Sequence, residues 1–130
     1  MKIMLCYDGS EEAKRALKLA QIHAKAFAGK IFAITAMKST PELELKEIEQ
    51  AERLLLDVEK DCNGKQIDCE TLALVHDLET GESLVQYAKD KKMEELVIGI
   101  RKTSKVGKIL FGSTAQYVIL ESECPVATIK

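Results

Sequence analysis

The apolar positions of this chain fall into five short runs rich in β-branched residues, separated by four longer stretches with helical spacing. The short runs cover residues 3–7, 31–37, 68–75, 95–99 and 126–129. Three of them lack polar alternation, which indicates strands buried on both faces, as in a parallel sheet covered by helices. The stretches between the runs are long enough for the crossovers that parallel neighbours need.

Apolar residues at three- and four-residue steps predict four helices, over about residues 10–27, 42–64, 81–91 and 113–123. Ser10 is a suitable N-cap for the first, and the proline at position 125 halts the last. The predicted inward stripe of the first helix consists of Ala13, Leu17, Ala20, Ala24 and Phe27. Strand and helix alternate throughout, so we expect one open, doubly wound α/β domain spanning residues 1–130.

Ligands of such sheets bind beyond the carboxyl ends of the strands, where the strand order reverses. The loop after the fourth strand carries four cations, and Gly112 then opens a helix. Free backbone N–H groups, a positive helix end and nearby cations make an anion site, for which phosphate is the natural guest. The residues concerned are Arg101, Lys102, Lys105, Lys108, Gly112, Ser113 and Thr114.

The loop after the first strand, residues 7–10, has the opposite character. Glu11 and Glu12 follow it, satisfy their own helix dipole and would repel a phosphate. We therefore expect Asp8 to bind the uncharged, hydrogen-bonding end of a ligand, and an adenosine fits that division. Each of these features also has a purely structural explanation. The basic loop can be ordinary solvated surface, Gly112 can be a turn residue, and Asp8 can cap the first helix or form an Asx turn. The position of all these residues at one end of one predicted sheet favours binding.

Composition narrows the function classes further. A net charge of −2 and a pI near 5.8 give no general reason to bind nucleic acid or anionic membranes. No apolar run approaches the roughly 18–20 residues of a membrane span. The chain enters a strand-like run at once, so we expect a cytoplasmic protein. Its four cysteines lack metal-ligand spacing and are expected to be reduced, although Cys62 and Cys69 flank a turn and could meet.

Other candidate groups are weaker. His23 lies away from the apolar stripe of the first helix and is expected to be exposed. His76 and Asp77 follow the third strand, and a catalytic or metal role for this pair lacks a third partner. No base that could orient water for ATP hydrolysis can be named, so an enzyme is not predicted and slow hydrolysis is the most we would expect.

The chain resembles the universal stress protein family over essentially its full length. The resemblance rests on the first strand ending in Asp8-Gly9-Ser10, on the strand end Val97-Ile98-Gly99, and on Gly112-Ser113. The nucleotide motif of the family is a glycine, two residues, a second glycine, nine residues, then glycine and serine or threonine. Gly99, Gly112 and Ser113 match that spacing, whereas Lys102 replaces the second glycine.

The resemblance implies a five-stranded parallel sheet of order 3-2-1-4-5 with four helices, and binding of ATP or another adenine nucleotide, with or without Mg²⁺. Asp8 would contact the adenosine, Ala36 the adenine through backbone atoms, and Ile98 and Gly99 the base or ribose. The phosphates would be held by Arg101, Gly112, Ser113 and Thr114, and Lys102 could add a contact through its side chain. Homodimers would form through the last strand, residues 126–129, an exposed sheet edge.

Two functions are compatible with this picture. The first is a regulatory module that binds an adenine nucleotide and acts through its dimer. The alternative, motivated by Lys102, is a dimeric protein-interaction module that has lost the nucleotide. A phosphoacceptor receiver domain shares this layout, but it needs an acidic pair after the first strand, where Asp8 stands alone.

Overall fold

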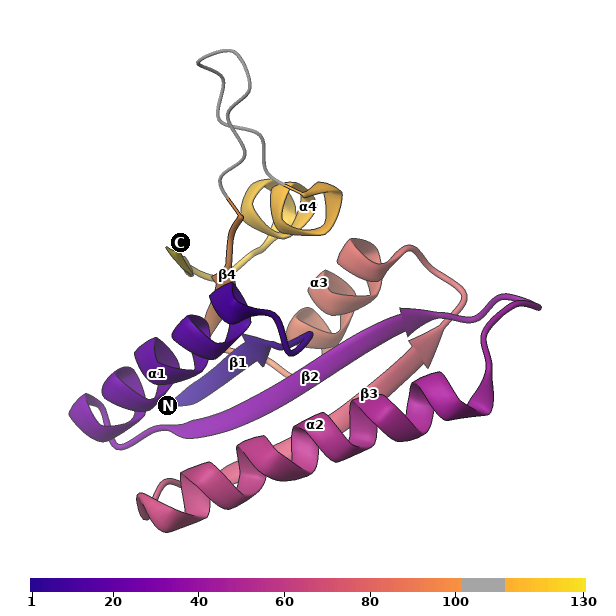
Figure 1. Ribbon diagram of the computed structural model, residues 1–130. Coiled ribbons are helices and arrows are strands. Elements are labelled where there is room, and N and C mark those ends of the chain that lie inside the picture. Colours follow the sequence, from indigo (N-terminus) through magenta and orange to yellow (C-terminus); the bar gives the residue numbers. More distant parts are fainter. Residues whose placement is uncertain (102–111) are drawn as a thin grey trace.

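The sheet has five parallel strands in the order β3-β2-β1-β4-β5, as the family resemblance implied. This computed structural model describes residues 1–101 and 112–130 (Figure 1). Its elements follow in strict alternation: β1 (Lys2–Cys6), α1 (Glu11–Ala26), β2 (Lys30–Lys38), α2 (Leu45–Gly64), β3 (Cys69–His76), α3 (Thr80–Asp90), β4 (Glu95–Gly99), α4 (Ser113–Glu121) and β5 (Val126–Ile129).

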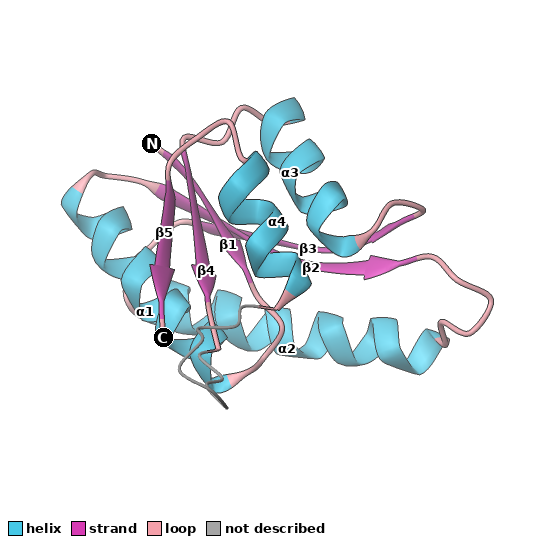
Figure 2. Cartoon of the chain, turned by 90° about the horizontal axis from the view of Figure 1, so that it is seen from above, coloured by secondary structure: helices cyan, strands magenta, loops and turns pink. Residues whose placement is uncertain are grey.

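Two helices cover each face of the sheet, which confirms the doubly wound arrangement. α1 and α2 lie on one face and α3 and α4 on the other (Figure 2). The side chains of β1 alternate between the two hydrophobic clusters, because successive residues of a strand point to opposite faces. Ile3 and Leu5 pack with α1 and α2, whereas Met4 packs with α3 and α4, and all three are fully buried.

The strand order reverses between β1 and β4. β1 connects to β2 through α1, whereas β4 connects to β5 through α4 on the opposite face. The two crossovers therefore diverge at the carboxyl ends of β1 and β4 and leave a crevice there.

The predicted stripe of α1 is confirmed at Ala13, Leu17, Ala20 and Ala24, which are all buried. The prediction for Phe27 is wrong, because its side chain is 59% exposed. Phe27 is the C-cap, with φ −115° and ψ 14°, so the chain has already left helical geometry there and the three- to four-residue spacing no longer sets its direction.

The four cysteines are free thiols, and Cys6, Cys62 and Cys69 are buried. Cys62, near the end of α2, and Cys69, at the start of β3, lie close enough for each thiol to shift the pKa of the other: Cys69 lowers the pKa of Cys62, and Cys62 raises that of Cys69. The prediction that these residues serve as reduced, buried side chains agrees with the structure. None of the helices in the described ranges has the length and apolar character needed to cross a membrane.

Candidate functional site

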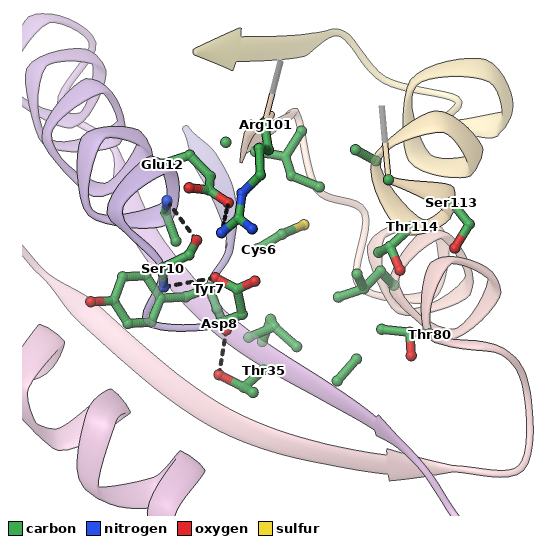
Figure 3. A pocket seen from close by; sticks show the side chains of 18 residues that line it. Cys6, Tyr7, Asp8, Ser10, Glu12, Thr35, Thr80, Arg101, Ser113 and Thr114 are labelled. Carbon is green, nitrogen blue, oxygen red and sulfur yellow. Dashed lines mark hydrogen bonds and ion pairs between the residues drawn. The ribbon is translucent and has the colours of Figure 1, made fainter. Parts of the chain in front are cut away.

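A pocket of about 340 Å³ opens at the carboxyl ends of β1 and β4, where the strand order reverses (Figure 3). That volume lies within the range of small-molecule sites. Its walls come from the ends of β1, β2 and β4 and from the first turns of α1, α3 and α4. The pocket is lined by Cys6, Tyr7, Asp8, Ser10, Glu12, Ala13, Ile34, Thr35, Ala36, Thr80, Leu84, Ile98, Gly99, Arg101, Gly112, Ser113, Thr114 and Ala115.

The turn after β1 fixes Asp8 at the pocket wall. Gly9 adopts φ +81°, a left-handed conformation that glycine tolerates without strain. This turn lets Asp8 Oδ1 accept a hydrogen bond from the Ser10 N–H at 3.0 Å, while Ser10 Oγ caps α1 by accepting from the Ala13 N–H at 3.1 Å. Asp8 is thus held in an Asx turn, with its carboxylate directed into the pocket in Figure 3.

The end of β1 is tied to β2 beside the pocket. The Thr35 hydroxyl donates to the Tyr7 carbonyl at 2.6 Å, and the Tyr7 N–H donates to the Ile34 carbonyl at 2.9 Å. These bonds hold the Asp8 turn and the strand segment that contains Ala36 as one rigid wall, although Asp8 itself is outside the sheet.

The first turn of α4 forms the opposite wall and has anion-binding character. Gly112 is its N-cap, and no side-chain hydrogen bond caps the helix among the described residues. The first turn carries no acidic residue, whereas α1 has Ser10 as its cap and two glutamates in its first turn. Ser113 and Thr114 line the pocket, and their amides belong to the first turn of the helix, where N–H groups lack intrahelical partners and the helix dipole is positive.

Arg101 lies at the mouth of the pocket and is paired with an acid. One of its guanidinium nitrogens, Nη2, lies 3.3 Å from Glu12 Oε1. The Arg101 side chain is 69% exposed, but that of Glu12 is only 15% exposed. The cation predicted to hold phosphate is thus paired with a carboxylate of the protein itself.

The structure brings together every predicted site residue that it describes. The residues that line this one pocket are Asp8, Ala36, Ile98, Gly99, Arg101, Gly112, Ser113 and Thr114. Lys102, like Lys105 and Lys108, lies outside the described residues. The roles assigned to these residues as nucleotide contacts stay predictions.

Sequence reasoning missed the contribution of α3. Thr80 and Leu84 line the pocket because α3 packs on α4, with Gly81 so close to Tyr117 that an added Cβ would lie 2.9 Å from Tyr117 Cβ. One signal was available: α3 follows β3, so its first turn lies at the same edge of the sheet as the Asp8 turn. The sequence predicts only that Glu12 repels phosphate, and it does not predict the pairing of Glu12 with Arg101.

Cys6 lines the pocket as a buried thiol. Burial, followed by the neighbouring Cys124 and Asp8, raises the pKa of the Cys6 thiol to about 12, so the thiol stays protonated at neutral pH. Reactive cysteines have the opposite property, a lowered pKa with exposure.

The two histidines take no part in this pocket. His76 Nδ1 accepts a hydrogen bond from the Leu78 N–H at 3.1 Å in the turn after β3. The expectation that His23 is exposed is wrong: its Nδ1 lies 2.7 Å from Glu95 Oε1, and its side chain is 24% exposed. Within residues 1–101 and 112–130, no group of three histidine, cysteine or acidic side chains is placed to bind a metal.

Comparison with known proteins agrees with this geometry. The family model described as the universal stress protein family matches residues 1–130. The chain belongs to the universal stress protein family. A universal stress protein of Methanocaldococcus jannaschii is 30% identical over 99% of this chain and 81% of its own length. One of Thermus aquaticus is 28% identical over 98% of this chain and 97% of its own length.

Solved structures of universal stress proteins share the fold. One from Archaeoglobus fulgidus superposes with a TM-score of 0.85 at 26% identity, over 99% of this chain and 91% of that one. A structure of an Archaeoglobus fulgidus universal stress protein in complex with dAMP gives a TM-score of 0.82 at 24% identity, over 99% of this chain and 95% of that one. A universal stress protein family protein of Arabidopsis thaliana with AMP bound gives a TM-score of 0.72 at 19% identity, over 100% of this chain and 91% of that one.

Proposed function

We propose that this universal stress protein is a regulatory module that binds ATP or a related adenine nucleotide and acts through a homodimer. The observation that carries the proposal is the division of charge across one pocket. The first turn of α4, which has no acidic residue and no side-chain cap among the described residues, lies across the pocket from the Asp8 turn. A phosphate suits the first wall. A hydroxyl group of the ribose or an amine of the base suits the second.

The residues on each wall support one orientation of a bound nucleotide. Ala36 and Ile98 offer apolar surface and backbone atoms for an adenine, and Ser113 and Thr114 offer amides and hydroxyls for phosphates. Related proteins bind ligands of this kind, since family members have been solved with dAMP and with AMP bound. We propose ATP, with or without Mg²⁺, as the nucleotide of this protein.

The homodimer is proposed to form through β5. Among the described strands, β5 pairs with β4 alone and lies at one end of the strand order. A free strand edge is a template for pairing with a second copy. Within the same proposal the protein works in the cytoplasm, which its four free thiols support.

Calorimetric titration of the purified protein with ATP, AMP and adenosine tests the proposal. Binding tighter than millimolar by at least one of them is expected. The alternative, an interaction module without nucleotide, requires an empty pocket, so a nucleotide that copurifies and is identified by mass spectrometry would exclude it. Failure of all three ligands to bind would overturn the nucleotide proposal.

A further inference from the structure

The Glu12 carboxylate lines the pocket and is paired with Arg101, the cation predicted to hold phosphate. Of the described lining residues, Asp8 and Glu12 are acidic and Arg101 is basic. Figure 3 shows Glu12 and Arg101 pointing toward each other across the pocket mouth, with Ser113 and Thr114 on the far side. The pocket that is expected to bind a polyanion therefore contains a carboxylate paired with its own arginine.

Glu12 is held in this position by the fold. It belongs to the first turn of α1, which Ser10 caps, and the backbone of this turn packs against Gly99 at the end of β4. Its side chain is only 15% exposed, so solvent screens its charge less than that of a surface glutamate.

A neighbouring acid shows that this arrangement is specific to Glu12. Glu11 lies in the same turn, but its side chain is 75% exposed and pairs with Lys14 at 3.2 Å, outside the pocket. The two residues carry the same charge one position apart, and only Glu12 lies where a ligand would meet it.

We infer that Glu12 is a specificity-determining residue that sets how many phosphates the pocket accepts, by competing with the ligand for Arg101 and repelling added negative charge. This inference rests on the proposed nucleotide function. A phosphate that reaches Arg101 must displace the carboxylate and then lie beside it, so the penalty grows with ligand charge. Glu12 thus favours adenosine and nucleoside monophosphates over ATP relative to the same pocket without it.

The test compares wild type with Glu12→Gln, which keeps the size of the side chain and removes its charge, in metal-free buffer containing EDTA. Calorimetry gives Kd for adenosine, AMP and ATP. In Glu12→Gln, Kd for adenosine is expected to stay the same, and Kd for ATP to fall by about tenfold, with AMP between them. The lysines at positions 102, 105 and 108 are identical in both proteins, so the change reports Glu12.

Glu11→Gln is the matched control, because it makes the same charge change outside the pocket and should leave the ratio of Kd for ATP to Kd for AMP unchanged. A ratio that is the same in Glu12→Gln as in wild type, or one that shifts equally in Glu11→Gln, would overturn the inference but leave nucleotide binding intact. Absence of binding of all three ligands by wild type and Glu12→Gln would instead overturn the proposed function, and the inference with it.

A double-mutant cycle shows whether Glu12 acts through Arg101. In an Arg101→Gln background the gain in ATP affinity from Glu12→Gln should shrink to less than half, because the released guanidinium is no longer present. A purely structural effect of Glu12 would persist unchanged in that background. Circular dichroism of each variant checks that α1 is intact.

Discussion

A Cβ atom on Gly99 would lie 2.3 Å from the carbonyl oxygen of Glu12 and 2.9 Å from the Ala13 amide nitrogen. Gly99 therefore allows the first turn of α1 to pack directly on the end of β4. The family resemblance predicts that this glycine contacts the base or ribose, whereas the structure shows that it lets two backbones approach closely. The contact is the reason that Glu12 reaches the mouth of the pocket.

Gly99→Ala is expected to reduce the free energy of unfolding by about 1–3 kcal/mol, because the obstructing atoms are backbone and cannot rotate away. Urea denaturation measures the effect. Gly64→Ala is the control: within the described residues an added Cβ there meets no atom within 4 Å, and alanine suits the helix, so stability should hold or rise slightly. Equal stability of Gly99→Ala and wild type would contradict the packing argument.

Ser113→Glu is expected to weaken nucleotide binding by more than about tenfold, because its carboxylate would satisfy the positive end of α4 as Glu11 and Glu12 do in α1. The fold should be unaffected, since an acid suits the first turn of a helix. Calorimetry with ATP and AMP measures the change. Gln116→Glu, which adds the same charge to an exposed position of α4 outside the pocket, should bind nearly as wild type. Similar losses in both variants would argue against phosphates at Ser113.

Thr128→Pro is expected to convert the proposed dimer to monomers. The Leu96 N–H donates to the Pro125 carbonyl and the Ile100 N–H to the Ile129 carbonyl, so alternate residues of β5 face β4 and the Thr128 N–H points away from β4. Proline there removes an edge donor and leaves the bonds to β4 intact. Sedimentation velocity measures the mass, with Thr128→Val as the control that keeps the N–H. A dimer that survives the proline would place the interface elsewhere.

Gln21 links α1 to the end of α2 and gives stability a dependence on pH. Its side chain is 5% exposed, and its Nε2 donates to Asp61 Oδ2 at 2.8 Å while Lys65 Nζ donates to its Oε1 at 3.1 Å. The hydrogen bond from Gln21, and then that from Lys65, lowers the pKa of Asp61 below its ordinary value of 3.8. This contribution is present above that value and is lost as pH falls through the lowered pKa.

Asp61→Asn should therefore reduce the loss of unfolding free energy that occurs below pH 4. It should also lower the unfolding free energy slightly at neutral pH. The Asp61 side chain is 46% exposed, so the neutral-pH loss is expected to stay below about 1 kcal/mol. Urea denaturation at pH 3 and pH 7 measures both quantities. An unchanged difference between the two pH values would show that Asp61 does not contribute to the acid sensitivity.

The sequence by itself determined the order of the elements and one side of the site. Ser10 caps α1 and Gly112 opens α4, as predicted, because a cap or a helix start depends on residues a few positions apart. Asp8 and Ser113 could be placed at one edge from sequence, since a parallel sheet brings all carboxyl strand ends together.

Only the tertiary structure decided which distant side chains meet. The pairing of Arg101 with Glu12, the contact of His23 with Glu95, and the entry of Thr80 into the pocket depend on how helices pack across the sheet. Periodicity gives the face a side chain lies on, but not its partner on another element. Partners are set by register, helix tilt and close contacts such as that at Gly99, which arise only when the whole core is packed.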